Sequence, residues 1–344
     1  MKSDIIAKLK NGKVGNGMKA LALFSGGLDS MLAIKLIADQ GIEVIAINIK
    51  TGFGGTKDIS ELMRSRAIKA GASMEIIDVR EEFIQKILFD PVYGYGKNFN
   101  PCIDCHGYMF KIAKGLMSKY DASFLITGEV VGQRPMSQRV DAMKQVSKLA
   151  QDTQDRLIVR PLSAKLMEET TPELEGWIDR EKLLAISGRS REEQMQLANK
   201  YGWEDYESPG GGCLLTEEHF SKRIEEFVAH DTLTVDEIDL LKFGRHFRLP
   251  DGAKLAVGRD KEDNEGLQSI TSNKYLAIAL PIGGPFSLLS KNATQADKIL
   301  ASKIAITYTR SSPNESYEIE IGQERVTVSP FAEKKEAQQY FFNA

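Results

Sequence analysis

The chain has 344 residues, of which 42% are hydrophobic and 27% are charged, and its net charge is −3. These values are typical of a globular protein with two or three domains and exclude a chain that must remain disordered. No apolar run approaches the roughly 18 residues that cross a bilayer, so we expect no membrane segment. Residues 1–17 lack the apolar stretch and the cleavage site of a secretion signal, which predicts a cytoplasmic protein.

Strands and helices alternate in the predicted structure of the first half. An apolar run at residues 20–24 ends at a Ser-Gly-Gly turn, after which the apolar positions follow helical spacing. Further apolar runs predict buried strands at 42–49, 74–79 and 122–128. Strands that are apolar throughout favour a parallel sheet with helices on both faces, which is an α/β fold. Ligands of such sheets bind where the strands end, here at 25–30, 51–55 and 128–133.

The segment SGGLDS, which follows the first strand, has the composition of an anion-binding turn. Gly26 and Gly27 allow backbone N–H groups to point inward, and the helix that follows contributes a positive dipole. The hydroxyls of Ser25 and Ser30 add two donors. The Walker A spacing and its lysine are missing. Asp29 would repel a phosphate on its own, so its presence predicts a bridging Mg²⁺ ion. A plain strand-to-helix turn with serine caps remains the alternative.

This hexapeptide resembles the signature of the PP-loop ATP pyrophosphatases, which adenylate a carbonyl oxygen and release pyrophosphate. Three further segments resemble the tRNA-thiolating branch of that superfamily, the 4-thiouridine synthases and 2-thiouridylases: NPCIDC at 100–105, ITGEVVGQRPMSQ at 126–138 and GGGCLLT at 210–216. The resemblance covers about residues 18–220. The sequence departs from these families because it shows neither a THUMP-like region before the loop nor a rhodanese domain after it.

The resemblance implies a set of ligands and contacts. It implies ATP and Mg²⁺ as cofactors and tRNA as the partner. The expected ATP-binding residues are Ser25, Gly26, Gly27, Asp29, Ser30 and Gly128. The expected contacts to nucleotide or RNA are Gln133, Arg134, Ser137 and Gln138.

The sequence has three cysteines, Cys102, Cys105 and Cys213. In a reducing cytoplasm a structural disulfide is disfavoured, and a C-x-x-C pair indicates redox chemistry or metal binding. By the same resemblance, one group of thiolases passes sulfur through a persulfide and a disulfide on two cysteines. A second group holds a [4Fe–4S] cluster with three cysteines, which leaves one iron open to hydrosulfide. The count of three fits the second group.

We therefore expect Cys102, Cys105 and Cys213 to be cluster ligands, and Asp29, Cys105 and Cys213 to be the catalytic residues. Persulfide or disulfide chemistry, a zinc site that includes His106, and buried thiols without a chemical role remain open. By itself, His106 is interpreted as a structural or surface histidine. The sequence determines neither the oligomeric state nor the sulfur donor, which is the persulfide of a cysteine desulfurase or free sulfide.

Residues 231–344 are predicted to be strand-rich and carry 14 Lys and Arg against 16 Asp and Glu. Strands are predicted at 274–281, 303–309, 317–321 and 325–330, and the alternation in the last two predicts a hairpin. Residues 249–267 resemble the opening of the NFACT RNA-binding domain, a small α+β unit, at Val257, Gly258, Arg259, Asn264 and Leu267. Arg259 is therefore an expected RNA contact. The segment as a whole is not basic, and the candidates for a basic face are Arg245, His246, Arg248, Lys254, Arg259 and Lys261.

The sequence thus predicts an N-terminal extension at 1–17, a PP-loop domain at 18–230 and an RNA-binding domain at 231–344. The expected activity is that of an ATP-dependent tRNA-uridine sulfurtransferase that forms AMP and pyrophosphate. The alternatives are a PP-loop synthetase that acts on a small molecule and an RNA-binding protein regulated by nucleotide. Pyrophosphate release that depends on tRNA distinguishes these three functions.

Overall fold

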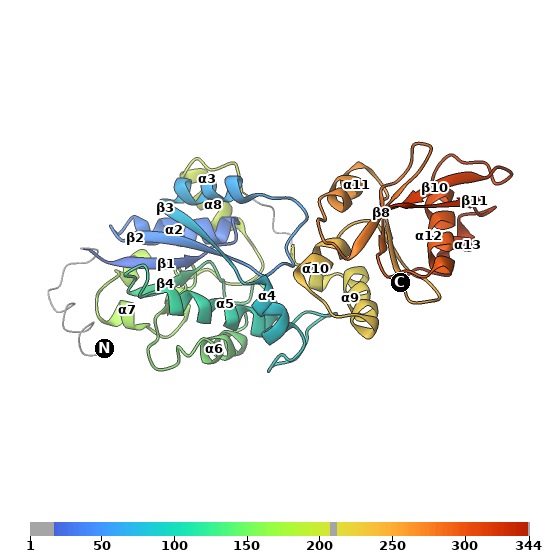
Figure 1. Ribbon diagram of the computed structural model, residues 1–344. Coiled ribbons are helices and arrows are strands. Elements are labelled where there is room, and N and C mark those ends of the chain that lie inside the picture. The colour runs from blue at the N-terminus through green and yellow to red at the C-terminus, as the bar shows by residue number, and fades with distance from the viewer. Residues whose placement is uncertain (1–16, 207–211, 343–344) are drawn as a thin grey trace. The chain divides into compact units, whose positions relative to one another are not determined.

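The computed structural model of the protein describes residues 17–206 and 212–342. These residues form two compact units (Figure 1). The first unit contains residues 17–51 and 57–206 together with Gly212, and the second contains residues 52–56 and 213–342. None of the helices in these ranges is long and apolar enough to span a membrane.

The first unit is built on a five-stranded parallel sheet with the strand order β3-β2-β1-β4-β5 (Figure 1). β1 lies in the centre, where Leu23 pairs with Ile47 of β2 and with Thr127 of β4. The first four strands coincide with the predicted apolar runs, so the predicted α/β fold is confirmed. The strands are β1 (Lys19–Leu23), β2 (Glu43–Lys50), β3 (Ala72–Asp78), β4 (Phe124–Thr127) and β5 (Ile158–Val159).

Helices cover both faces of this sheet, which explains why its central strands are apolar throughout. Ala20 and Ala22 of β1 pack with α2, whereas Leu21 points to the opposite face, and none of the three is more than 1% exposed. α2, α3 and α8 lie on one face, and α5 and α6 lie on the other (Figure 1). The helices are α2 (Leu28–Ala38), α3 (Ser60–Ala70), α4 (Arg80–Phe83), the π-helix η1 (Ile84–Leu88), α5 (Cys102–Leu116), α6 (Val140–Leu149), η2 (Ala164–Leu166), α7 (Thr171–Leu174), η3 (Arg180–Lys182) and α8 (Glu192–Lys200).

The second unit is an α+β fold on a six-stranded antiparallel sheet with the order β11-β10-β8-β9-β7-β6. On β7, Leu255 packs into the cluster formed with α12, and the next residue, Ala256, packs with α10 and α11 on the opposite face. The elements are η4 (Leu214–Thr216), α9 (Glu218–His230), α10 (Val235–Leu241), β6 (Arg245–Arg248), β7 (Lys254–Val257), α11 (Lys261–Gln268), β8 (Tyr275–Ala279), β9 (Ser287–Ser290), α12 (Gln295–Thr307), β10 (Tyr317–Ile321), β11 (Glu324–Val328) and α13 (Lys335–Gln338).

One predicted strand of this unit is wrong. β10 and β11 form the predicted hairpin, but residues 303–307 belong to α12 rather than to a strand. The helix begins after Thr294, whose hydroxyl accepts a hydrogen bond from the N–H of Asp297 at 3.2 Å. The buried residues Ala301, Ile304 and Ala305 recur at helical spacing, and this period outweighs the β-branched composition of the segment.

The second unit begins at Cys213, which differs from the expected boundary at residue 231. α9 is amphipathic and turns its apolar face toward this unit, where the ring of Phe227 lies 3.9 Å from the ammonium of Lys254. Residues 52–56, from the predicted loop after β2, also belong here. The carbonyl of Phe53 accepts a hydrogen bond from the N–H of Leu214 at 3.0 Å. The ring of Phe53 packs edge-on against the ring of Phe220.

Candidate nucleotide and sulfur site

The loop between β1 and α2 has the geometry of an anion site. Gly26 has a φ of +79°, in the left-handed region that favours glycine. The carbonyl of Gly27 accepts hydrogen bonds from the Ser30 hydroxyl at 2.7 Å and from the N–H of Met31 at 3.1 Å, so the helix begins within the motif. Ser25 is exposed, and its hydroxyl accepts a hydrogen bond from the N–H of Gly27 at 3.4 Å. The loop thus places an exposed serine and the N-terminus of α2 at the carboxyl end of β1, which is the arrangement of an anion site.

Gly128 brings the end of β4 against this loop. A Cβ at this position would lie 2.5 Å from the carbonyl carbon of Asp29 and 2.5 Å from the backbone nitrogen of Ser30. No side chain fits at that distance, so the close approach of the two segments requires glycine. The structure therefore brings Gly128 together with the predicted loop residues.

The carboxylate of Asp29 has two polar neighbours. The amide Nε2 of Gln133 donates to Oδ2 of Asp29 at 2.9 Å, and Nη2 of Arg191 lies 3.9 Å from Oδ1. Gln133 was expected at the site. Arg191 was not, because it precedes α8 in a segment without a recognised motif.

A second arginine that the sequence did not indicate lies behind the loop. Arg66 of α3 is 4% exposed, and its Nη1 donates to the carbonyl of Gly26 at 3.2 Å. Its Nη2 pairs with Oδ1 of Asp205 at 3.0 Å. In the sequence Arg66 is one of several cations on an amphipathic helix, so only the fold reveals that it positions the loop.

Cys102 and Cys105 lie in the first turn of α5. Side chains three positions apart share one side of a helix, so the two thiols lie together near its positive end, which favours thiolates. Both are half-buried, and neither forms a disulfide. Asp104 accepts two backbone N–H groups from the preceding loop, at 2.7 and 3.0 Å, and so fixes the start of the helix.

His106 connects Cys102 to a buried carboxylate. Its Nδ1 lies 3.0 Å from Oε1 of Glu129, and its ring also forms a hydrogen bond with the sulfur of Cys102. Glu129 is 4% exposed, and its Oε2 accepts from Nε of Arg160 at 3.0 Å. His106 therefore has partners on both sides and is not an isolated surface histidine.

The charges along this chain of residues favour a thiolate beside an imidazolium. Burial opposes the charge on His106, but hydrogen bonds to Cys102 and Glu129 raise its pKa to about 10. Burial also raises the pKa of Cys102, but the hydrogen bond and charge of His106, with the charge of Arg134, bring that pKa below its usual value. Burial works against Glu129 too, and the charges of Arg160 and His106 hold its pKa below the usual range. The thiolate that results is the form that attacks electrophiles and binds metals.

The other predicted nucleotide or RNA contacts lie in different environments. Arg134 is exposed, Ser137 is fully buried beside Cys102, and Gln138 is 7% exposed. The expected contacts of these three residues to nucleotide or RNA stay predictions.

Cys213 lies in the second unit, directly before η4, and is half-buried. Cys102 and Cys105 belong to the first unit. The residues that the structure describes contain no group of three or more His, Cys, Asp or Glu side chains arranged to hold a metal ion. The convergence of the three thiols therefore stays a prediction.

The motif V-G-R-x-x-x-x-N forms the start of α11 in the second unit. Gly258 has no room for a side chain, because a Cβ would lie 2.0 Å from Oδ1 of Asn264. That oxygen accepts a hydrogen bond from the N–H of Phe286 at 2.9 Å. Arg259 pairs with Oδ2 of Asp263 at 2.6 Å, yet its side chain remains 47% exposed. Glycine and asparagine thus have structural roles, and the arginine presents a charge at the surface.

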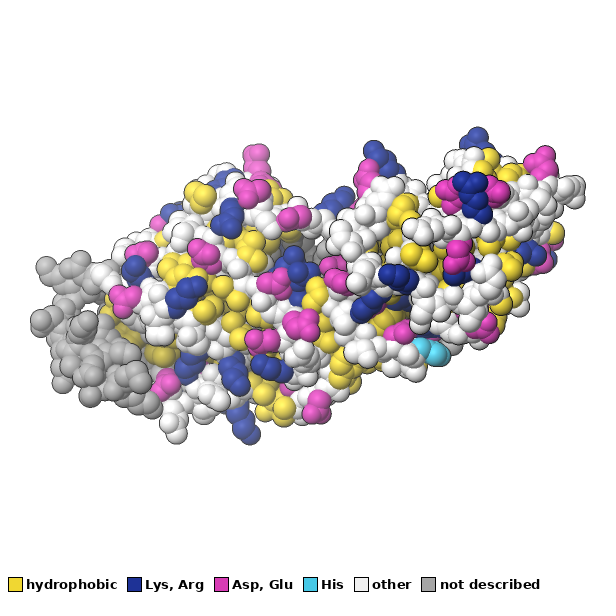
Figure 2. Space-filling model, viewed as in Figure 1, with side chains coloured by type: hydrophobic (Ala, Val, Ile, Leu, Met, Phe, Trp, Pro, Cys, Tyr) yellow, Lys and Arg dark blue, Asp and Glu magenta, His cyan; other side chains and the backbone are white. Residues whose placement is uncertain are grey.

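The predicted basic face does not form from all of its candidates. Lys254 is 2% exposed and donates to a buried glutamate at 2.6 Å, and His246 is 3% exposed. Arg248 pairs with two carboxylates, each at 2.9 Å. Arg259 and Lys261 remain exposed at the start of α11. On the face seen in Figure 2, basic and acidic side chains are interspersed.

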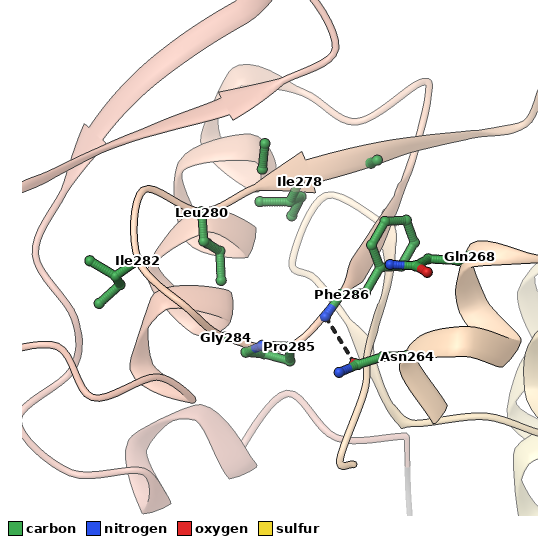
Figure 3. A pocket seen from close by; sticks show the side chains of 10 residues that line it. Asn264, Gln268, Ile278, Leu280, Ile282, Gly284, Pro285 and Phe286 are labelled. Carbon is green, nitrogen blue, oxygen red and sulfur yellow. Dashed lines mark hydrogen bonds between the residues drawn. The ribbon is translucent and has the colours of Figure 1, made fainter. Parts of the chain in front are cut away.

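A shallow cavity of about 380 Å³, open to solvent, lies between α11 and the segment that follows β8 (Figure 3). The amides of Asn264 and Gln268 line it on the helix side. The ring of Phe286 and the side chains of Leu280 and Ile282 supply its apolar part. The lining thus combines an aromatic ring, aliphatic side chains and two amide groups.

Comparisons with known proteins match two parts of the chain. Residues 19–100 match the N-terminal HUP domain of argininosuccinate synthase, and residues 244–341 match the NFACT protein RNA binding domain. The chain is 30% identical over 136 residues to a tRNA-specific 2-thiouridylase of Cytophaga hutchinsonii. It is also 30% identical over 161 residues to a probable tRNA sulfurtransferase of Thermococcus kodakarensis. These matches confirm both resemblances, to the PP-loop enzymes of the tRNA thiouridine branch and to the NFACT RNA-binding domain.

The matches cover only part of each protein. The two alignments include 35% and 45% of this chain, and 37% and 40% of the relatives. The chain thus spans about two fifths of the length of these curated relatives. A crystal structure of a 4-thiouridine synthetase–RNA complex with bound ATP aligns with 22% identity and a TM-score of 0.39, over 55% of this chain and 42% of that one.

Proposed function

We propose that this protein, which resembles the PP-loop tRNA thiouridine enzymes, uses ATP to replace a uridine carbonyl oxygen of tRNA with sulfur. Two consecutive residues carry the proposal. Gly128 touches the backbone of Asp29 in the nucleotide loop, and Glu129 holds His106 against Cys102. A site for ATP and a reactive thiol thus share one segment of the first unit, as an enzyme that activates a carbonyl and then delivers sulfur to it requires.

The chemistry takes two steps. The uracil carbonyl oxygen attacks the α-phosphorus of ATP, and the bond from that phosphorus to its bridging oxygen breaks, so that pyrophosphate leaves. Hydrosulfide then attacks the activated carbon and loses its proton, and AMP departs with the former carbonyl oxygen. If the sulfur comes instead from a persulfide on one cysteine, the thiol of a second cysteine breaks the S–S bond and the two cysteines end as a disulfide. Backbone N–H groups of the loop and the N-terminus of α2 bind the polyphosphate. Asp29 would hold Mg²⁺, which supplies positive charge to the leaving group.

The thiols of the first unit fit the donors of an iron–sulfur cluster. Cys102 and Cys105 lie one helical turn apart, and the surroundings of Cys102 favour a thiolate. With Cys213 they would hold a [4Fe–4S] cluster, which would supply a binding site for hydrosulfide. The contact between His106 and Cys102 equally suits a persulfide on Cys102, so both sulfur mechanisms remain candidates.

Iron analysis distinguishes the two mechanisms. Protein purified without oxygen is assayed for iron and acid-labile sulfide, together with the single variants Cys102→Ala, Cys105→Ala and Cys213→Ala. Under the cluster mechanism each variant loses iron and activity together. Under the persulfide mechanism the wild type lacks iron and one of the three variants stays active.

The second unit is proposed to bind tRNA. Its match to the NFACT RNA-binding domain, the exposed Arg259 and Lys261, and the cavity beside Phe286 support this role. We further propose that the sulfur comes from the persulfide of a cysteine desulfurase or from free sulfide. A cytoplasmic location is also part of the proposal.

A synthetase that acts on a small molecule is the second candidate. It is favoured by the match of residues 19–100 to the argininosuccinate synthase HUP domain. A synthetase of this kind would release pyrophosphate without RNA. An RNA-binding protein that is only regulated by nucleotide would release none.

The proposal is tested by pyrophosphate release with and without tRNA. We expect release to depend on tRNA and to be lost in Asp29→Asn, because a loop carboxylate facing phosphates is tolerable mainly as a metal ligand. The control is Asp39→Asn, an exposed carboxylate at the other end of α2 that should leave the rate unchanged. A normal rate in Asp29→Asn at saturating Mg²⁺ would remove Asp29 from the mechanism.

A further inference from the structure

Arg191 faces the nucleotide loop without a good partner. Its Nη2 lies 3.9 Å from Oδ1 of Asp29, which is too long for a hydrogen bond. The other oxygen of Asp29 is taken by Gln133 at 2.9 Å. The side chains of Arg191 and Asp29 are only 13% and 22% exposed, so the guanidinium lies inside the site rather than on the surface.

The fold holds Arg191 in this place through the segment that precedes α8. Ser187 forms a parallel bridge with Val131, and the N–H of Gly188 donates to the carbonyl of Val131 at 2.8 Å. The fully buried hydroxyl of Ser163 joins the two segments, because it accepts from the Val131 backbone at 3.0 Å and donates to the other segment at 2.7 Å. The segment after β4 and the segment before α8 therefore arrive together at Asp29.

Three buried polar atoms around Asp29 lack a hydrogen-bond partner among the residues that the structure describes. They are Oδ1 of Asp29, Oε1 of Gln133 and Nε of Arg191. Buried polar groups in folded proteins are nearly always hydrogen-bonded, so these three neighbouring atoms form a place where a polar ligand or water binds. A guanidinium is the side chain best suited to bind phosphate oxygens, because its donors match their geometry.

We propose that Arg191 binds the β- and γ-phosphates of ATP. The inference rests on the proposed function for the presence of ATP and adds a residue to that site. When the bond between the α-phosphorus and its bridging oxygen breaks, negative charge grows on the pyrophosphate. A cation fixed beside the loop stabilises that charge more strongly than the charge of the bound ATP, so Arg191 acts on both binding and rate. The alternative is a structural role in which Arg191 only balances the charge of Asp29.

The test compares nucleotides that differ in phosphate number. Binding of ATP and of AMP to the full-length protein is measured by calorimetry with Mg²⁺. We expect Arg191→Met to weaken ATP binding by about 10-fold or more and to leave AMP binding within about twofold. Pyrophosphate release with tRNA should fall by about 10²-fold, and Arg191→Lys should recover part of both losses. The matched control is Arg189→Met, an exposed arginine of the same segment, which should behave as the wild type.

The outcomes separate this inference from the proposed function. The inference is overturned if Arg191→Met weakens the binding of ATP and AMP equally, or weakens neither. An unchanged melting temperature of the variant excludes unfolding as the cause of weaker binding. If Arg191→Met does not fold, Arg191→Lys takes its place. A ratio of ATP to AMP affinity below that of the wild type then supports the inference, and an unchanged ratio overturns it. If the wild type prefers ATP to AMP but forms no thiouridine, the proposed function fails and the role of Arg191 stands. If the wild type binds no ATP, both fail.

Discussion

Glu129 controls the charge state of its neighbours. Its carboxylate is 4% exposed and lies between Arg160 and His106, each at 3.0 Å. A buried carboxylate needs such partners, because burial alone favours its neutral form. With Glu129 charged, His106 keeps its proton and Cys102 favours the thiolate. The sequence identified the segment 126–138, which contains Glu129, and the C-x-x-C pair, but spacing along the chain does not show that His106 joins them.

The reactivity of Cys102 tests this arrangement. We expect the midpoint pH for alkylation of Cys102 by iodoacetamide, followed by mass spectrometry of metal-free protein, to lie below the ordinary thiol value of about 8.5. His106→Gln should raise that midpoint, because burial remains and the stabilising cation is lost. His219→Gln, an exposed histidine on α9, should leave it unchanged. Equal midpoints in all three proteins would show that His106 does not act on the thiol.

The charges of His106 and Cys102 make the stability of the first unit depend on pH. The pKa of His106 is raised to about 10, so its contribution is lost as the pH rises through about 10. The pKa of Cys102 is lowered, so its contribution is lost as the pH falls through that lowered value. The pair is therefore expected to stabilise the first unit between these two limits.

Among the elements, β1, α2 and β4 meet at the loop Ser25–Ser30, where we propose that ATP binds. The strands were predictable because helices cover both faces and leave them apolar throughout. The two-residue strand β5 was too short to give a pattern, and α12 was mistaken in part for a strand because its β-branched residues obscured the helical spacing. The contact of Gly128 with α2 was not visible in the sequence either, since one glycine in a motif does not reveal what lies against it.

Gly128→Ala tests the contact between these elements. The added Cβ would lie 2.5 Å from backbone atoms of Asp29 and Ser30, so we expect a loss of about 1–3 kcal/mol in the free energy of unfolding and weaker ATP binding. Gly115→Ala in α5 is the control, because its Cβ would meet no atom within 4 Å, and it should be neutral or slightly stabilising. Urea unfolding and ATP titration measure both. Wild-type behaviour of Gly128→Ala would show that the contact is not needed.

On the scale of the whole molecule, the chain divides near Cys213 rather than at residue 231. The sequence placed the boundary where the composition changes, but α9 lies before that change and packs with the second unit. The basic residues of that unit were also misleading, since charge in a sequence does not show which cations are already paired. Lys254 and Arg248 form internal ion pairs, and Arg259 and Lys261 are left exposed at α11.

The proposed binding of RNA by the second unit is tested by substituting two exposed arginines. Arg259→Gln should weaken tRNA binding and reduce the slope of log affinity against log salt by about 1, as expected for the loss of one phosphate contact. Arg325→Gln in the β10–β11 hairpin is the control, because this arginine is also exposed and ion-paired but lies outside the motif. Equal binding by both variants and the wild type would place the RNA contact elsewhere.

The proposed thiolation of tRNA is tested by the nucleoside content of the tRNA product. Anaerobically purified protein is incubated with unmodified tRNA, ATP, Mg²⁺ and sulfide, and the tRNA is digested and analysed by mass spectrometry. We expect a thiouridine that appears only when ATP is present and that is absent with Asp29→Asn. One pyrophosphate should be released for each thiouridine. Pyrophosphate release without any thiouridine, or release that does not require tRNA, would contradict it.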